Sequence, residues 1–347
     1  MLGLVTADNL LLLFVFWELT SITSYMLIGF NHESEKARKL ALQGLFVTVG
    51  GGLLLMTGVI LLGSMAGTLQ ISEIIQQPLE AQGMLVNVML VLILMGAFTK
   101  SAQFPFHFWL PNPMAAPTPV SAFLHSATMV KAGIFLMARL HPALGEQILW
   151  SSLQLWAGGI TMILGGVLAY TAIDIKKALA YSTLMALGTL TFLLGIGHQA
   201  AMVAFISLLL AHSLYKASLF MLAGAIDHSA GTKDLTQLGG LKKTMPITFI
   251  LMVVAALSLA GLPPVFGFIA KELVFEAALA VNTGLVLVAI IMACLGVAVA
   301  IILVIKPFLG ADTSLPKKPH EASLPTLAGP ALRPSTSLLI CLLPGIA

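Results

Sequence analysis

Long apolar stretches dominate this sequence and restrict it to folds that lie within a lipid bilayer. A transmembrane helix needs about 20 mostly apolar residues. Such segments are expected at 3–30, 42–64, 85–103, 120–140, 153–171, 178–197, 200–225, 246–282 with a break, and 284–306. Hydrophobic residues make up 59% of the 347 residues, and charged residues only 9%. We therefore predict an all-α polytopic membrane protein with about nine transmembrane segments.

Basic residues in the loops predict which side of the membrane each loop faces. Lysines and arginines follow the first, seventh and last predicted segments and precede the sixth. The loops 65–84, 141–152 and 195–199 contain none. Because Lys and Arg are enriched in cytoplasmic loops, we expect the basic side to be cytoplasmic.

The two ends of the sequence suggest a fragment of a longer protein. The first apolar run has no basic region or small-residue cleavage site, so a signal peptide is not predicted. Residues 310–336 are polar and rich in proline, and the apolar run 337–347 is too short to span a membrane. We expect residues 1–309 to form one membrane domain. Residues 310–347 are interpreted as a loop and the start of a further span, in a chain truncated at both ends.

Four lysines lie inside the apolar segments: Lys100, Lys131, Lys216 and Lys271. A charge at the centre of a bilayer costs roughly 2.5–3.5 kcal/mol on insertion scales, so ionisable residues there usually mark a functional pathway. A lysine can avoid this cost by releasing its proton. The pattern therefore indicates movement of protons or other ions through the membrane.

Two of these lysines lie next to prolines that break a predicted span. Lys100 precedes Pro105, whereas Lys271 follows Pro263 and Pro264. The reversed order is expected if two repeats cross the membrane in opposite senses, and broken helices in matching positions point to an ion site near the bilayer midplane. We predict two inverted helical repeats with discontinuous helices, the first at about 1–141 and the second at about 153–309.

Other ionisable residues accompany the lysines. Glu18 lies in mid-span and shares a helix face with Ser21. We interpret it as a carboxylate that exchanges or tunes protons, with a static buried ion pair as the alternative. His212 and Lys216 are four residues apart and face the same side of a helix, which favours sharing one proton over holding two.

A second histidine lies before Lys131. Histidine can change its charge near neutral pH, so His125 and Lys131 are a candidate relay, with a hydrogen-bonded core histidine as the alternative. For Lys100 the alternative is a kinked helix whose lysine reaches the membrane interface. Glu272 is a weaker candidate, because a position at the outer interface is an equally good interpretation.

The sequence shows none of the familiar enzyme motifs. HExxH, GxSxG, Walker and Rossmann signatures are absent, and the only cysteines are Cys294 and Cys341. We therefore expect no catalytic residues, no metal site, no cofactor and no nucleic-acid partner.

Several motifs together resemble one family, the antiporter-like proton-translocating membrane subunits shared by Mrp-type Na⁺/H⁺ antiporters and respiratory complex I. The resemblance covers nearly the whole chain. Further matches, at 67–74, 227–234 and 319–322, resemble the A-type subunits of Mrp antiporters, which are the longest members of the family. The motifs that carry the family resemblance are Phe16-Trp17-Glu18-Leu19, Lys100-Ser101-Ala102-Gln103, Trp109-Leu110-Pro111, Ala116-Pro117-Thr118-Pro119-Val120-Ser121-Ala122, 174–183 and Leu238-Gly239-Gly240-Leu241.

The resemblance implies a fold of two inverted five-helix repeats and a role for each candidate residue. Glu18 and Lys100 would form the first-half pair, Lys131 or His125 the relay, His212 and Lys216 the central axis, and Lys271 the terminal site. One departure is Met185-Ala186, where many relatives have Ser-Gln. The cation site is expected outside this chain.

The function implied by the resemblance is proton translocation in a multisubunit antiporter of the bacterial cell (inner) membrane. Its partners would be other Mrp antiporter subunits, the lipid bilayer, protons, and Na⁺ or another monovalent cation. The alternative is a proton-pumping, non-catalytic subunit of respiratory complex I or a membrane-bound hydrogenase. A passive membrane scaffold is a third interpretation.

Overall fold

A computed structural model describes residues 1–76, 79, 82–111, 114, 116–126 and 128–342. Within these residues, seven helices are long and apolar enough to cross a membrane, and two shorter apolar helices cover Met84–Lys100 and Pro246–Ala260. Together they follow the nine predicted segments. The all-α polytopic class is confirmed, although residues 343–347 of the predicted further span lie outside the described residues.

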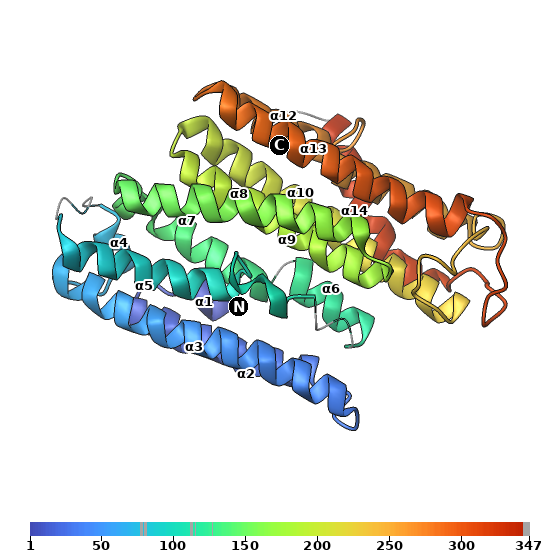
Figure 1. The fold of residues 1–347 in the computed structure, drawn as a ribbon, viewed down its shortest axis with the longest axis horizontal. Helices are drawn as coiled ribbons and strands as arrows, with labels where there is room; N and C mark the ends of the chain where they lie inside the picture. The colour runs from blue at the N-terminus through green and yellow to red at the C-terminus, as the bar shows by residue number, and fades with distance from the viewer. Residues whose placement is uncertain (77–78, 80–81, 112–113, 115, 127, 343–347) are drawn as a thin grey trace. The chain divides into compact units, whose positions relative to one another are not determined.

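The elements follow one another as helices joined by turns and loops (Figure 1). The first half contains α1 (Leu2–Thr6), α2 (Leu10–Ile28), α3 (Glu35–Ala66), α4 (Ile71–Ile74), α5 (Met84–Lys100), η1 (Phe106–Trp109), α6 (Thr118–Ser126), η3 (Met129–Lys131) and α7 (Ala132–Leu144). The second half contains α8 (Ile148–Thr171), α9 (Ile175–Ile196), α10 (Gln199–Ala230), α11 (Pro246–Ala260), α12 (Phe266–Leu279), α13 (Thr283–Val304), η4 (Ile305–Leu309) and α14 (Leu324–Leu342).

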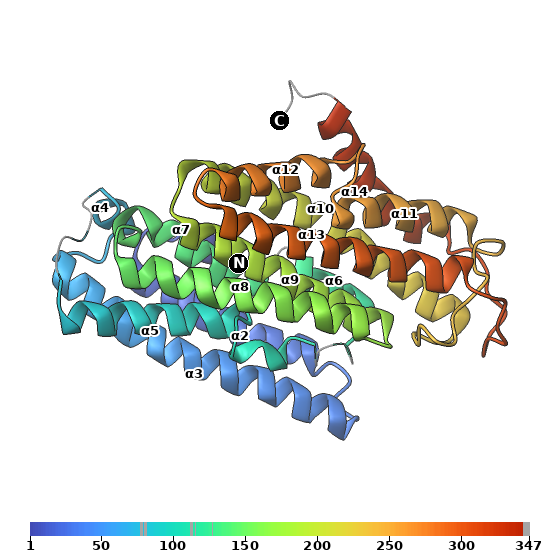
Figure 2. The ribbon, with the colours of Figure 1, turned by 45° about the horizontal axis from the view of Figure 1, so that its top comes forward.

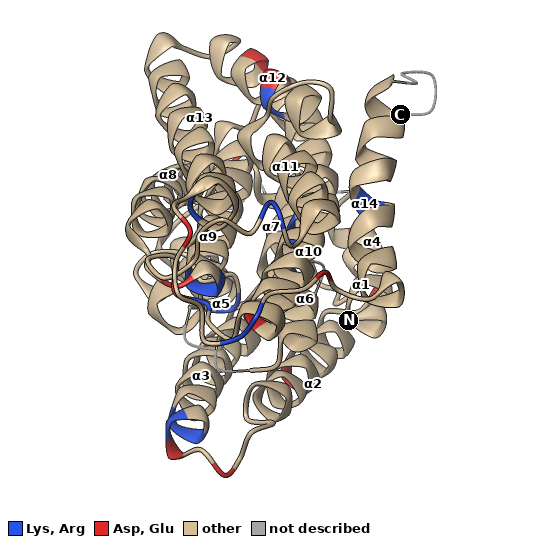
Figure 3. Cartoon of the chain, turned by 90° about the vertical axis from the view of Figure 1, so that its right-hand side faces the viewer, with Lys and Arg blue, Asp and Glu red and all other residues tan. Residues whose placement is uncertain are grey.

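The chain divides into two compact units. The first contains Met1–Ala116, Ala127–Thr161 and Leu187–Gly197; the second contains Pro117–Ser126, Met162–Ala186 and His198–Ala347. In the first unit, α3 packs against α2 and α5, and α5 packs against α7. In the second unit, α10 is central and contacts α6, α11, α12 and α14 (Figure 2). Charged residues are sparse along these helices (Figure 3), as a bilayer requires.

The first span was predicted as one continuous segment, 3–30, and this prediction is wrong near its start. The structure has a short α1 and a separate α2, because the side chain of Asn9 accepts hydrogen bonds from the backbone amides of Leu11 and Leu12 and so begins a new helix. The neighbouring carboxylate of Asp8 accepts bonds from the amide and hydroxyl of Ser72. Asp8 is thus held by α4 and does not lie within a span.

The same local construction occurs once in each unit. The helices α3 and α10 each contain 32 residues and end at a glycine in the left-handed region, Gly67 (φ 71°) and Gly231 (φ 74°). In both, the next residue is a threonine whose hydroxyl accepts the amide two residues further on, at 3.2 Å. Each loop then forms an antiparallel bridge with the residue just before the helix that comes one earlier in the chain. Asn9, before α2, pairs with Gln70, and Asp174, before α9, pairs with Asp234. This recurrence favours two repeats, whose bounds stay a prediction.

The C-terminal helix begins earlier than the apolar run that was expected to contain it. We predicted a polar loop up to residue 336, whereas α14 starts at Leu324 and contains Pro330 and Pro334. Pro334 has no N–H, so the carbonyl of Pro330 lacks an intrahelical donor. The hydroxyl of Ser218 on α10 donates to that carbonyl at 3.0 Å. A tertiary contact therefore supports the proline-containing helix.

Candidate functional site

Lys100 is the last residue of α5 and is completely buried. Its Nζ donates to the hydroxyl Oγ of Ser21 at 2.6 Å and to the backbone carbonyl of Trp17 at 2.9 Å, both on α2. The same Nζ lies 5.2 Å from the centre of the Trp17 ring. The chain leaves helical geometry immediately afterwards, at Ala102 (φ 50°). The predicted helix break therefore lies directly beside the buried amine.

Glu18 lies one residue after Trp17 but is not a direct hydrogen-bond partner of Lys100. It is half-buried and interacts electrostatically with Lys100. Its Oε1 makes no hydrogen bond to any part of the chain that the structure describes. A Cβ placed on Gly52 of α3 would lie only 1.7 Å from this oxygen. Glycine at position 52 therefore leaves the space that the carboxylate occupies.

Lys131 lies in the η3 turn before α7 and is 7% exposed. This turn contacts α2 and α5, the helices that contain Glu18 and Lys100. The hydroxyl of Ser101 donates to the carbonyl of Val130 at 2.7 Å and accepts the amide of Ile134 at 3.1 Å. The residue after Lys100 thus fixes the backbone on both sides of Lys131.

Lys216 is completely buried on α10 in the second unit and repeats the arrangement of Lys100. Its Nζ donates to Oγ of Ser182 at 2.6 Å and to the carbonyl of Leu179 at 3.1 Å, both on α9. In each unit the serine also donates to the same carbonyl: Ser21 to Trp17 at 3.4 Å, and Ser182 to Leu179 at 3.0 Å. Lysine, serine and carbonyl therefore form one triangle in each unit.

Two buried histidines lie near Lys216 in the second unit. His212 is one helical turn before it on α10, and its ring meets Tyr215 edge-on with centroids 5.4 Å apart. His125 on α6 lies 5.0 Å from the ring of Phe220 and interacts electrostatically with Lys216. Neither ring nitrogen of His125 has a hydrogen-bond partner among the described residues.

Lys271 lies on α12, just after the second helix break, and is 6% exposed. Its Nζ donates to the carbonyl of Ala260, the last residue of α11, at 2.7 Å. A Cβ on Gly296 of α13 would approach this Nζ to 2.7 Å. Glu272 is exposed, because adjacent residues on a helix point in different directions. The structure therefore places Lys271, but not Glu272, in a buried site.

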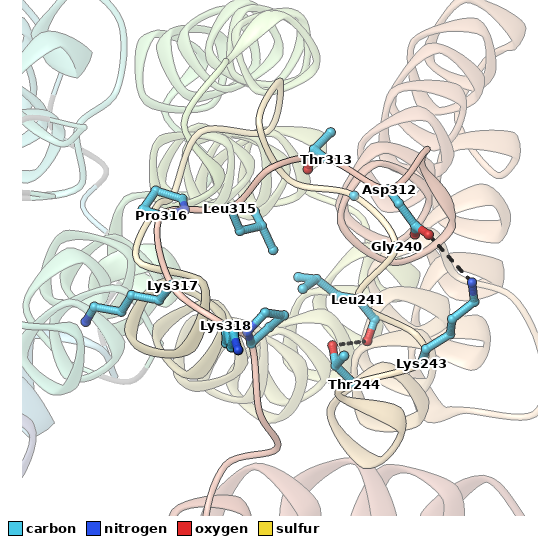
Figure 4. A pocket seen from close by; sticks show the side chains of 12 residues that line it. Gly240, Leu241, Lys243, Thr244, Asp312, Thr313, Leu315, Pro316, Lys317 and Lys318 are labelled. Carbon is cyan, nitrogen blue, oxygen red and sulfur yellow. Dashed lines mark hydrogen bonds and ion pairs between the residues drawn. The ribbon is translucent and has the colours of Figure 1, made fainter.

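Ser182 and Ser101 were not among the sequence-predicted site residues. Their hydroxyls act on residues far away in the sequence, and the only local signals were the Tyr181-Ser182-Thr183 and Lys100-Ser101 motifs. A separate cavity of about 410 Å³, bounded by 239–244 and 312–319 (Figure 4), contains none of the predicted site residues. Among the described residues, no three or more His, Cys, Asp or Glu side chains could hold a metal ion together.

Comparison with known proteins gives the family. Residues 7–296 match the family described as "NADH:quinone oxidoreductase/Mrp antiporter, TM". The chain is 45% identical to a probable K(+)/H(+) antiporter subunit of Rhizobium meliloti (strain 1021), over 92% of this chain and 33% of that protein. It is also 45% identical to an Na(+)/H(+) antiporter subunit of Bacillus subtilis (strain 168), over 81% of this chain and 37% of that protein.

A solved structure shares the fold. A chain of the Mrp complex from Dietzia sp. DQ12-45-1b superposes with a TM-score of 0.86 and 40% identity, covering 98% of this chain and 37% of that chain. The chain thus spans about a third to a half of the length of the relatives it matches. The named relatives are antiporter subunits, which suggests a transporter, and their bacterial origin and the apolar helices indicate a multi-pass cell-membrane location. The chain belongs to the NADH:quinone oxidoreductase/Mrp antiporter transmembrane family.

Proposed function

We propose that this chain is a proton-translocating part of a multisubunit cation/H⁺ antiporter in the bacterial cell membrane. Its partners are other Mrp-type subunits, and it exchanges protons for Na⁺ or another monovalent cation. The names of the relatives support this proposal, and they include both a K(+)/H(+) and a Na(+)/H(+) antiporter. The observation that carries it is the triangle of buried lysine, serine and carbonyl that recurs at Lys100 and Lys216.

This triangle accommodates a lysine with or without its proton. A charged ammonium has three donors and can donate to both the hydroxyl and the carbonyl. A neutral amine still has N–H groups for the carbonyl, and its lone pair can accept a hydrogen bond from the serine hydroxyl after that O–H rotates. Both protonation states therefore keep their hydrogen bonds, which lowers the cost of taking up and releasing a proton in a dry environment.

The proposed route uses the candidate residues in two groups. Glu18 and Lys100 respond to charge outside the first unit, and Lys131 takes part in the relay. In the second unit, His125, His212 and Lys216 pass the proton, and Lys271 lies at the terminal site. Glu272 is a peripheral candidate. Within this proposal, residues 1–309 are the translocating domain, with repeats at about 1–141 and 153–309, and 310–347 leads toward a further span.

A second candidate is a proton-pumping subunit of a redox complex. The family description names NADH:quinone oxidoreductase together with the Mrp antiporter. The antiporter names among relatives at 45% identity favour the first candidate. Neighbouring genes for small antiporter subunits would support it, whereas genes for quinone-reductase or hydrogenase subunits would support the second.

The test is cation-dependent ΔpH in everted membrane vesicles that contain the full complex. We expect Lys216→Ala and Lys100→Ala to abolish exchange while the complex still assembles, because each removes a titrating amine from its triangle. Lys318→Ala, which removes an exposed lysine, is the matched control and should retain activity. Full exchange by both buried-lysine variants would show that these lysines are structural.

A further inference from the structure

A second cavity in the second unit, of about 540 Å³, lies where the end of α10 meets the first turn of α6 and the segment before α14. Its lining includes Thr118, His228, His320 and Ser323. Both histidines are exposed. The basic residues that follow α10 place this end of the helix on the cytoplasmic side by the positive-inside rule.

The two histidines of this cavity are held together by Ser229. Its hydroxyl donates to the carbonyl of His320 at 2.6 Å and accepts the amide of His320 at 2.8 Å. Ser229 directly follows His228 in α10, so the backbone positions that present the two imidazoles are coupled. This contact places two titratable rings on the wall of one cavity.

The contact between α6 and α10 leads from this cavity toward Lys216. One ridge of α10 contains, four residues apart, Lys216, Phe220, Gly224 and His228. A Cβ on Gly224 would meet Thr118 of α6 at 2.4 Å. The ring of His125, also on α6, lies against Phe220. Thr118 and His125 are separated by about 10 Å along the helix, at roughly 1.5 Å per residue. A short contact therefore joins the cavity to the buried histidine.

Polar atoms without partners lie along this contact. Ser121 and His125 are fully buried, and the hydroxyl of Ser121 and both ring nitrogens of His125 have no hydrogen-bond partner in the described chain. The two residues are four apart on α6 and share a face. Buried polar groups of this kind are normally satisfied, and ordered water is the usual partner when no protein group is present.

We propose that the cavity at His228 and His320 is the cytoplasmic entrance through which protons exchange with His125 and Lys216, by way of Ser121 and water between α6 and α10. This inference rests on the proposed function and adds the access route to it. The two histidines are the proton-exchanging groups at the entrance, and either one can serve because both line the same space.

Blocking the cavity with a charged group tests this proposal. Ser323→Cys in the full complex is labelled from the cytoplasmic side of everted vesicles with a positively charged methanethiosulfonate. We expect labelling to lower the exchange rate by at least about tenfold, equivalent to a barrier increase of about 1.4 kcal/mol. Ser314→Cys, exposed in the same loop but not on the cavity wall, should change little. Thr326→Cys replaces Ser323→Cys if that variant does not assemble.

The histidines are tested in the same vesicles. The double variant His228→Ala/His320→Ala should lose exchange, each single variant should lose less, and His32→Ala, an exposed histidine in the first unit, should be unaffected. Unchanged exchange in fully labelled cavity variants and in the double variant would overturn the access route. If Lys216→Ala is inactive in that case, only the access route fails; if Lys216→Ala is also fully active, the proposed function fails with it.

Discussion

Lys100 and Lys216 are held by hydroxyl and carbonyl groups rather than by carboxylates. A carboxylate in direct contact would favour the charged lysine and hold the proton in place. A serine hydroxyl can act as acceptor or donor, so it imposes no such preference. Glu18, which acts on Lys100 at longer range, can bias the amine without trapping its proton.

Gly52 is the position where a small change should alter the effect of Glu18 on the protonation of Lys100. Gly52→Ala would place a methyl group where Oε1 of Glu18 now lies. We expect the carboxylate to move and the exchange rate to fall, with a loss of stability of about 1–3 kcal/mol from overpacking. Vesicle ΔpH assays and thermal unfolding of the purified complex measure the two effects.

Gly50 provides the control on the same helix. It is exposed, and a Cβ there has no neighbour within 4 Å. Gly50→Ala should therefore leave exchange unchanged and stabilise the helix by up to about 1 kcal/mol. Equal behaviour of the two variants would contradict the proposed role of the space beside Glu18.

At the residue scale, the sequence predicts the lysines but not their partners. A charge inside an apolar run is a local signal, so Lys100, Lys131, Lys216 and Lys271 are visible without a structure. Ser182 bonds to a lysine 34 residues away, and Ser101 to a carbonyl 29 residues away. These pairings depend on helix packing, which the sequence pattern does not specify.

At the scale of elements, the helix breaks depend on side chains that replace missing backbone hydrogen bonds. Ser101 is the main example, because its hydroxyl satisfies a carbonyl and an amide on the two sides of Lys131. Ser218 does the same for the carbonyl that Pro334 leaves without a donor in α14. Irregular backbone within a bilayer is tolerated only where such partners are present.

Ser101→Ala should destabilise the turn around Lys131. The variant leaves two buried backbone groups without their partner, at a cost of about 1–3 kcal/mol for each that stays unsatisfied. We expect a lower unfolding temperature and slower exchange. Thr57→Ala, which removes an exposed hydroxyl bonded only to its own helix, is the control. A Ser101→Ala protein as stable as the control would show that water or a rearranged backbone replaces the hydroxyl.

The sequence predicts the spans and the helix breaks, but it does not predict α1 or the start of α14. Apolar length identifies the spans, and the prolines correctly indicate breaks after α5 and after α11. The start of α14 was not predicted, because two prolines argue against a helix unless a neighbouring side chain supplies the missing bond. The separate α1 was missed because capping by Asn9 is a weak signal within a long apolar run.

At the scale of the whole molecule, the chain corresponds to about a third to a half of its relatives. Their antiport belongs to longer proteins, and the solved relative is part of a complex. We therefore expect this chain alone, reconstituted in liposomes, to show no Na⁺- or K⁺-dependent ΔpH, because the proposed exchange requires the other subunits of the complex. Exchange by the purified chain, above that of Lys216→Ala liposomes, would contradict this prediction.

The equal lengths of α3 and α10 have a consequence for how the chain meets lipid. Each helix has 32 residues and measures about 48 Å at 1.5 Å per residue, whereas the hydrocarbon layer is about 30 Å thick. About 18 Å of each helix must be taken up by tilt or extend into the headgroup region. Extension brings the Gly67 and Gly231 turns to a depth where water and lipid phosphates can solvate exposed peptide groups. Helix length would then determine where polar backbone can lie in the membrane.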